Sequence, residues 1–496
     1  MNFSLVSDVD YLWASIAMPC LLVLYVAILK NWRLGIYGLI IFIPFCGLPT
    51  ILLYPAPVWT HVLKDVLFVL PAYIGFLRWY VFGQKGAARF LIPPVPICAL
   101  VLLAVIATLG LLNPALANFM VGLIGLRTWL FYIPMVFLGY HLVRSKAELI
   151  SVSRLMILMA AVPALFGIVQ ALLYYSGDKE AAYAIYGTAA YEVTQGFTSF
   201  SAVGGTNGLT RLPSLFTFGL QYSFFLFTML PIAAALAVAE QTRPARIVAR
   251  AALAVILMAG FFSGSRAAFV MMPALLVFTA VLVGGGRGAV RRILGVVVLT
   301  GLGLFVVTTL LDSKIRSLGM HVLDAANIEL LTALPYEFHL AAQAPWLGVG
   351  TGMTTGPARV AFTSLTSMED LGVGGIENYY AKARVELGVP GMIVVIILMV
   401  QIAMRAYWVR RLVSDRALNY FAATLTAFFA IVVAYLVKGS PIDYDPLNVY
   451  FWLFFGMLLK LPRLQAEMGG GTLSPATTCR LEAGILSRKN HDNRFK

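Results

Sequence analysis

Long apolar segments recur along almost the whole chain and constrain its fold more than any other feature. Thirteen of them have about the length, roughly 20 residues, that a helix needs to cross the hydrocarbon of a bilayer. They lie at 11–29, 34–53, 62–82, 93–112, 119–140, 150–175, 213–239, 247–263, 267–284, 289–311, 387–404, 418–437 and 447–461. Only 12% of the residues are charged, about half the share in soluble domains. We therefore predict an all-α polytopic transmembrane bundle of 12–13 spans and exclude a soluble enzyme, a disordered chain and a disulfide scaffold.

Basic residues are distributed unevenly over the connections between these segments. The short connections 54–61 and 113–118 contain no Lys or Arg, whereas the alternate connections are rich in both. Because cytoplasmic loops of membrane proteins collect Lys and Arg, we expect the basic connections inside, the N-terminus outside and the C-terminal tail inside. A count of 12 spans would require one assignment to fail, most simply the first helix. The net charge of +14 is then mostly topological and does not indicate nucleic-acid binding.

Two of the connections on the outer side are long, at 176–212 and 312–386. Structureless loops beyond about 12–15 residues are uncommon in compact domains. The larger one contains apolar stretches, so we expect short helices packed on the membrane face, a large helical periplasmic loop. We predict one transmembrane domain, 1–464, followed by a disordered cytoplasmic tail, 465–496.

A few cations lie outside the cytoplasmic set and become candidate site residues. They are Lys64, Arg127, Arg211, Arg266, Lys382 and Arg384. An ionisable side chain within or against the bilayer is costly and normally faces a polar cavity or a partner. Arg127 lies about 12 Å into its span at 1.5 Å per residue. Two interpretations remain open for it, a buried ion pair with Asp65 or a cation that lines a cavity.

Arg266 follows a Ser-Gly-Ser turn and begins the next apolar helix. Free backbone N–H groups, the hydroxyl of Ser265 and the positive end of the helix dipole would suit a phosphate there. An arginine that extends to the membrane interface is the alternative. Arg211 precedes an apolar helix and allows the same two interpretations. Together the two guanidinium groups would bind a pyrophosphate through fork-like hydrogen bonds.

The sequence IENYYAKARVELGVPG is interpreted as the start of a helix. On it, Glu377, Tyr380 and Arg384 share one face, and Lys382 and Glu386 are spaced as an i,i+4 ion pair. Glu377 would be a general base if it is partly desolvated. It would equally be a capping carboxylate at the helix N-terminus, and the sequence leaves both open.

No spacing typical of a metal site or of a nucleotide-phosphate loop occurs in the chain, so we predict neither a metal nor a cofactor.

These segments, in this order, resemble the O-antigen ligase/polymerase superfamily of bacterial cell envelopes, which includes Wzy-type polymerases. The resemblance covers nearly the whole membrane region. It rests on KDVLF (64–68), GLRTWLFYIPM (125–135), RLPSLFTFG (211–219), SGSRAAF (263–269), PWLGVGTG (345–352) and ENYYAKARVELGVPG (377–391).

This resemblance implies an enzyme in the bacterial inner membrane whose active site faces the periplasm. Its substrate would be an undecaprenyl-pyrophosphate-linked oligosaccharide, and it would use no nucleotide sugar and no metal. The family's pyrophosphate-binding arginines correspond to Arg211 and Arg266. Ligases carry a His-Asn pair where this chain has Glu377-Asn378, and an acidic residue before Asn is similar to the polymerase branch.

Our working hypothesis is a polymerase of lipid-linked repeat units for O-antigen, capsule or exopolysaccharide. Glu377 would be the base, the two arginines would bind pyrophosphate, and Lys382 or Arg384 would set the charge state of Glu377. Further supporting residues are Lys64, Asp65, Arg127, Asn378 and Tyr380. The aromatic loop 183–200 would stack on sugars or anchor at the membrane interface.

Two other functions remain open at this stage. One is a ligase that transfers finished glycan to lipid A-core or to protein, and the other is a lipid or anion transporter or flippase. The expected partners are membrane lipid and a chain-length regulator or export machinery.

Overall fold

The computed structural model describes residues 8–53, 58–83, 93–116, 118–184, 202–203, 209–284, 295, 332–355 and 376–468. In these residues the chain is almost entirely helical. The helices are α1 (Asp8–Lys30), α2 (Trp32–Phe42), α3 (Leu48–Leu52), α4 (Leu70–Arg78), α5 (Ile97–Leu109), α6 (Phe119–Leu130), α7 (Met135–Leu142), α8 (Lys146–Ser176), α9 (Lys179–Tyr183), α10 (Gly219–Ala239), α11 (Arg243–Phe262), α12 (Arg266–Val283), α15 (Leu334–Gln343), α17 (Tyr379–Leu412), α18 (Arg416–Tyr435) and α19 (Leu447–Met468). Two-residue strands, β1 (Ala202–Val203) and β2 (Leu209–Thr210), pair antiparallel with Ala202 opposite Thr210.

The helices confirm the predicted all-α polytopic membrane fold. Among the described residues, eight helical segments are long and apolar enough to cross a membrane: Trp59–Phe82, Phe119–Leu142, Lys146–Ser176, Gly219–Ala239, Arg243–Phe262, Arg266–Val283, Tyr379–Leu412 and Arg416–Tyr435. Shorter apolar helices at Pro19–Lys30, Trp32–Phe45 and Ile97–Leu112 coincide with further predicted spans. The predicted span at 447–461 falls within α19, and the one at 289–311 lies outside the described residues apart from Gly295.

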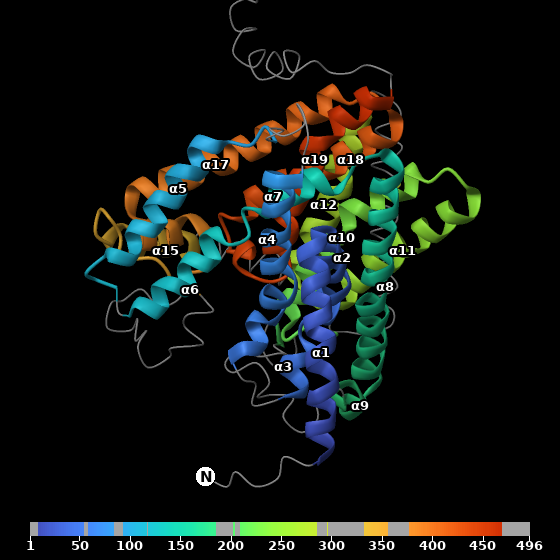
Figure 1. Ribbon diagram of the computed structural model, residues 1–496, viewed down its shortest axis with the longest axis horizontal. Coiled ribbons are helices and arrows are strands. Elements are labelled where there is room, and N and C mark those ends of the chain that lie inside the picture. The colour runs from blue at the N-terminus through green and yellow to red at the C-terminus, as the bar shows by residue number, and fades with distance from the viewer. Residues whose placement is uncertain are drawn as a thin grey trace, which may run out of the picture.

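Helix α10 forms the centre of the bundle. It packs against α8, α11 and α18, and 89% of its most apolar 18-residue window is buried. Figure 1 shows a second group, α5, α6 and α15, that lies to one side and is joined to the bundle by α17. Since α10 is apolar on all sides and yet buried, protein rather than lipid surrounds most of it.

Polar residues and glycines mark where the helices begin, end and bend. Ser145 caps α8 by accepting a hydrogen bond from the backbone N–H of Glu148 at 3.2 Å, and Gly177 ends the helix in the left-handed region at φ 103°. Within α17, Gly388 has φ 73° and Pro390 follows it, so the helix changes direction here. The part of α17 before Gly388 packs against α15.

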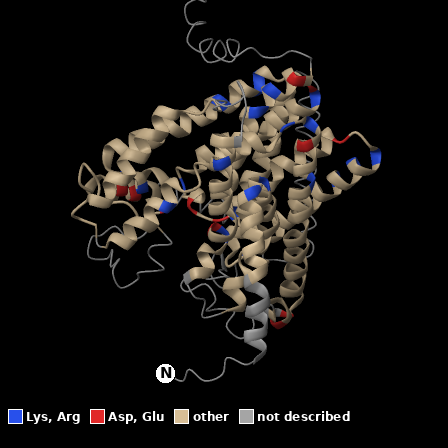
Figure 2. Cartoon of the chain, in the orientation of Figure 1, with Lys and Arg blue, Asp and Glu red and all other residues tan. Residues whose placement is uncertain are grey.

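Charged side chains gather at one end of the bundle and in a layer nearer its middle (Figure 2). Ion pairs tie helices together at that charged end. They join Arg33 to Glu148 at 2.5 Å, Lys146 to Asp415 at 2.9 Å and Arg154 to Glu240 at 2.6 Å. This is the end that the sequence assigns to the cytoplasm.

The predicted boundary between the transmembrane domain, 1–464, and the tail lies within a helix. Helix α19 continues to Met468. The rest of the predicted tail, 469–496, lies outside the described residues.

Two glycines allow α7 and α19 to approach each other closely. A Cβ atom on Gly139 would collide with the backbone carbonyl of Leu453, and one on Gly456 would collide with that of Val136. Small residues at helix contacts are the usual means of close packing in membranes, where lipid gives little hydrophobic drive for association.

We expect Gly456→Val to destabilise the protein by about 1–3 kcal/mol, because the added side chain must separate the two helices. The measurement is the thermal unfolding midpoint of the purified full-length chain in detergent. Leu158→Val, on the exposed side of α8 where Leu158 is 62% exposed, serves as the matched control and should leave the midpoint nearly unchanged. Equal midpoints for the two variants would contradict the close contact.

Candidate functional site

Two loops bring the blocks that contain Arg211 and Arg266 together. The backbone N–H of Leu212 donates to the carbonyl of Ser263 at 3.1 Å. Gly264 adopts φ 67° in the turn before α12, and Ser265 stands at the N-cap with Arg266 as the first helical residue. Residues about 50 positions apart in sequence are therefore neighbours at the start of α10 and α12.

Within the described part of the chain, Arg211 has no anionic partner. Its Nε atom is buried and forms no hydrogen bond, and among the described residues neither Arg211 nor Arg266 forms a salt bridge. Burial, followed by the charge of Arg266, lowers the pKa of Arg211 below its ordinary value, while Tyr435 and Glu377 act in the opposite direction. Two like charges that interact in a partly buried place are a local electrostatic cost, which a bound anion would offset.

The start of α17 presents Glu377 to the same region. Asn378 caps the helix by accepting from the N–H groups of Tyr380 at 2.8 Å and Ala381 at 3.1 Å. The carboxylate of Glu337 accepts from the backbone N–H groups of Glu377 at 3.1 Å and Asn378 at 2.9 Å. Capping is thus performed by Asn378 and Glu337, whereas Glu377 is exposed. Of its two predicted roles, the structure gives the capping role to its neighbours.

The remaining predicted residues of α17 have separate partners. Tyr380 donates its hydroxyl to the carbonyl of Val433 at 3.2 Å. Arg384 donates to the carbonyls of Ala344 and Pro345, each at 2.8 Å. It therefore holds the C-terminal end of α15 instead of turning towards Glu377.

The predicted i,i+4 pair of Lys382 with Glu386 is wrong, because each side chain takes a different partner. Lys382 is buried, pairs with Asp443 at 2.5 Å and lies 4.8 Å from the ring centroid of Trp129. Glu386 is fully buried and accepts from Trp129 Nε1 at 2.7 Å. In a low-dielectric interior these tertiary partners outweigh a local helix pair, which contributes only about 0.2–0.5 kcal/mol.

Sequence reasoning missed the role of Glu386 as an anchor. Besides Trp129, its carboxylate accepts from Gly352 N at 2.8 Å, from Thr354 N at 2.9 Å and from the hydroxyls of Thr354 and Thr355 at 2.7 and 3.0 Å. These bonds fix the glycine-rich end of the described stretch 332–355. The sequence feature that could have indicated this role is the position of Glu386, a lone carboxylate at the start of a long apolar segment.

A buried ionic cluster unites Lys64, Asp65 and Arg127. Lys64 Nζ is 2.9 Å from Asp65, 3.0 Å from Asp445 and 2.6 Å from the hydroxyl of Tyr132. Arg127 Nε donates to Asp65 at 3.0 Å, which confirms the ion pair that was one of its two interpretations. These three predicted residues form a separate network and do not contact Arg211 or Arg266 in the described structure.

The connection between α18 and α19 was not singled out from the sequence, yet it contacts Lys382, Lys64 and Phe218. Its Asp443 pairs with Lys382 and its Asp445 pairs with Lys64. Tyr444 lies edge-to-face with Phe218, 5.9 Å between ring centroids, in the segment that contains Arg211. The sequence feature that could have indicated this connection is the presence of two aspartates, Asp443 and Asp445, between two apolar segments.

Among the described residues, no three His, Cys, Asp or Glu side chains converge as a metal site requires. Most of the predicted aromatic loop, 185–200, lies outside the described residues.

Residues 251–396 match the O-antigen ligase family, Wzy_C. This part of the chain is therefore similar to that family. This finding confirms the resemblance to the O-antigen ligase/polymerase superfamily, a family of glycosyltransferase-type membrane enzymes. The match includes Arg266 and the start of α17 but ends before the connection between α18 and α19. A search among curated proteins found no match to the chain.

We expect Asp443→Asn to destabilise the protein by about 3–5 kcal/mol, because it leaves the buried Lys382 without a counter-charge. The double variant Lys382→Met with Asp443→Leu should recover most of that loss, since it removes both charges. Thermal unfolding of the full-length chain in detergent measures both effects. The matched control is Glu467→Gln, which breaks an exposed pair with Arg463 and should cost less than about 1 kcal/mol. Similar losses for Asp443→Asn and the double variant would contradict the ion pair.

Proposed function

We propose that the protein polymerises undecaprenyl-pyrophosphate-linked repeat units at the periplasmic face of the bacterial inner membrane. The observation that carries the proposal is the pair of adjacent arginines, Arg211 and Arg266, that lacks a carboxylate partner within the described chain. A pyrophosphate would supply the missing negative charge, and the glycosyltransferase family of the domain makes it the expected leaving group.

The position of the pair along the bundle supports an active site remote from the basic end. Helix α12 has 18 residues and is therefore about 27 Å long. Arg266 is at one end of it, and the carbonyl of Leu282 at the other end accepts from Arg410, one of the predicted cytoplasmic arginines. If the basic end is cytoplasmic, Arg266 faces the periplasm.

In the proposed reaction, a hydroxyl oxygen of the acceptor sugar attacks the anomeric carbon of the donor. The bond from that carbon to the pyrophosphate oxygen breaks, and its electron pair leaves with undecaprenyl pyrophosphate. Arg211 and Arg266 stabilise the charge that grows on the leaving group. Glu377 accepts the proton from the acceptor hydroxyl.

Polymerase is preferred over ligase because Glu377-Asn378 replaces the His-Asn pair of ligases. The buried Lys64–Asp65–Arg127 cluster and Asn378 act as support in this proposal, since each is already engaged with protein partners. Tyr380, Lys382 and Arg384 likewise hold α17 in place.

Substituting either arginine by glutamine should weaken pyrophosphate binding by at least roughly tenfold, because a hydrogen bond to a charged group contributes about 1.5–3 kcal/mol. Calorimetric titration of inorganic pyrophosphate into the detergent-purified protein measures the affinity of wild type, Arg211→Gln and Arg266→Gln. Arg243→Gln, an exposed change at the far end of α11, is the matched control. Unchanged affinity in both site variants would refute the proposed clamp.

The reaction itself is tested by reconstituting the protein with a purified lipid-linked repeat unit. A ladder of products on a gel supports a polymerase, a single transfer to an added acceptor identifies a ligase, and no covalent product indicates a transporter. Glu377→Gln should reduce product formation by about 10²–10⁴-fold while pyrophosphate still binds, because an amide cannot accept the proton. Undiminished product from this variant removes Glu377 as the base.

A further inference from the structure

The backbone of Glu377 is held by hydrogen bonds at both of its polar groups. The carboxylate of Glu337 accepts from the N–H groups of Glu377 at 3.1 Å and of Asn378 at 2.9 Å. On the other side of the residue, the hydroxyl of Ser440 donates to the carbonyl of Glu377 at 2.7 Å. The side chain of Glu377 is exposed. Its main chain is therefore fixed while its carboxylate remains accessible.

Glu337 reaches this place from the buried face of α15. That face contains Glu337, Leu340 and Ala341, which follow one another at the spacing of one side of a helix. Leu340 and Ala341 pack in an apolar cluster with Ala381 of α17, and Glu337 is only 8% exposed. A carboxylate removed from water is costly unless it accepts hydrogen bonds, and two N–H groups at the positive end of α17 supply them. The bonds that stabilise the buried Glu337 therefore also fix the backbone of Glu377.

Helix α15 is attached to α17 near its other end as well. Arg384 donates to the carbonyls of Ala344 and Pro345, each at 2.8 Å. Figure 1 shows α15 beside the first part of α17, against which it packs. Because α15 is bonded to α17 near both of its ends, Glu337 keeps a fixed position relative to Glu377.

The end of α18 supplies a further support. The backbone N–H of Tyr379 donates to the carbonyl of Leu436 at 3.0 Å, and the side-chain amide of Asn378 donates to the carbonyl of Val437. Residues 377–379 are thus bonded to α15, to the end of α18 and to the connection that follows α18.

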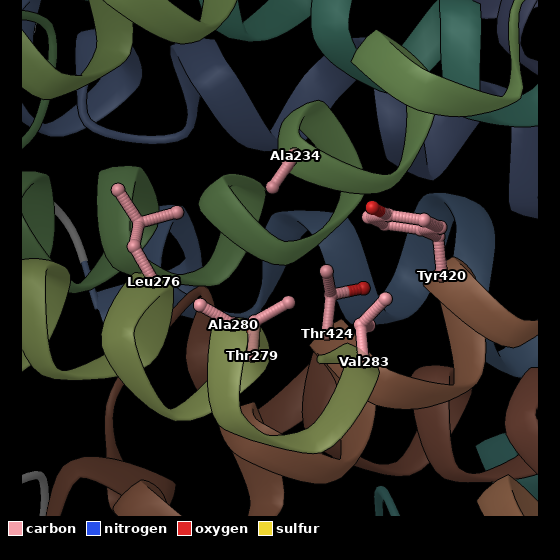
Figure 3. Close-up of a pocket in the computed structure, with 7 residues that line it drawn as sticks. All are labelled: Ala234, Leu276, Thr279, Ala280, Val283, Tyr420 and Thr424. Carbon is pink, nitrogen blue, oxygen red and sulfur yellow. The ribbon is translucent and has the colours of Figure 1, made fainter. Parts of the chain in front are cut away.

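Helix α18 relates these residues to the arginine pair. It packs against α10 and α12, and Figure 3 shows one part of this contact, where Tyr420 of α18, Ala234 of α10 and Leu276 of α12 line a small pocket. Arg266 is the first residue of α12, and Arg211 lies in the segment that leads into α10. Glu377 is close enough for its charge to act on Arg211. The packing of the three helices therefore fixes the start of α17 relative to both arginines.

We propose that Glu337 and Ser440 are positioning residues for the transfer reaction. They hold the backbone of Glu377 so that its carboxylate reaches the acceptor hydroxyl beside the arginine pair. This role rests on the proposed function, in which Glu377 takes the proton of that hydroxyl. Glu337 and Ser440 exchange no proton. They act through the position of Glu377, which must lie within hydrogen-bond reach of the proton that it accepts.

Initial rates of product formation with the reconstituted lipid-linked repeat unit test this role. Glu337→Gln replaces one accepting oxygen by an NH2 group, which cannot accept from a backbone N–H. It should lower kcat about 10–100-fold, because displacement of a catalytic group by about 1 Å has an effect of that size. The affinity for inorganic pyrophosphate should match wild type, because both arginines remain. Glu180→Gln, which removes an exposed carboxylate of α9, is the matched control and should keep the wild-type rate.

A double-mutant cycle separates positioning from a general loss of stability. In a Glu377→Gln background, Glu337→Gln should cause no further loss of turnover, because there is no longer a base to position. Ser440→Ala should slow the wild-type background about 2–10-fold, the effect of losing one neutral hydrogen bond. Ser440→Thr keeps the hydroxyl and should retain the wild-type rate.

The outcomes distinguish this role from the proposed function. Undiminished turnover by Glu377→Gln overturns both. Slow turnover by Glu377→Gln together with wild-type turnover by Glu337→Gln overturns the positioning role alone, and so do equal fold losses from Glu337→Gln in the two backgrounds. If Glu337→Gln does not fold, the two Ser440 variants decide the question, and equal rates for Ser440→Ala and Ser440→Thr would overturn the proposal.

Discussion

Neutralisation of buried cations is the constraint on which the rest of this membrane fold depends. Removing a charge from water costs several kcal/mol per ion even after relaxation, and three cations lie within the bundle. Asp65 and Asp445 neutralise Lys64 and Arg127, and Asp443 neutralises Lys382. Two of these aspartates belong to the short connection between α18 and α19, so that connection fixes how the last two helices meet α17 and the helix that carries Lys64.

Arg211 and Arg266 differ from these cations, because no aspartate or glutamate of the described residues forms an ion pair with them. Their loops are joined through Leu212 and Ser263, and the described residues supply them with no ion pair, although they pair Lys64, Arg127 and Lys382. Among the described residues, Glu377 is the carboxylate whose charge acts on Arg211, and it is exposed. Three aspartates neutralise those three cations, and under the proposed function a bound pyrophosphate would neutralise this pair.

The sequence predicted the features that hydrophobicity and charge determine locally. Apolar runs of span length coincided with most of the long described helices, although α17 (Tyr379–Leu412) extends eight residues beyond the predicted span 387–404 at each end. The search for cations outside the basic connections found Arg127, Arg211 and Arg266. Apart from the pair of Arg127 with Asp65, it did not predict which carboxylate meets which cation, because that depends on packing between distant segments. Lys382 and Glu386 show the failure, since their spacing indicated an ion pair but Asp443 and Trp129 lie closer in the folded chain. Asp443 and Asp445 escaped notice because, in sequence, they are ordinary residues of a short connection.

An open arginine pair also relates ligand binding to stability. The repulsion between the two guanidinium groups raises the free energy of the ligand-free protein. An anion that binds between them removes this repulsion, and the energy released adds to its affinity. The native state is stabilised in proportion to the logarithm of the ligand concentration above its dissociation constant, whereas the neutralised clusters around Asp65 and Asp443 have no such dependence. Under the proposed function, the pyrophosphate of the donor would therefore neutralise two arginines for which the described residues provide no counter-charge.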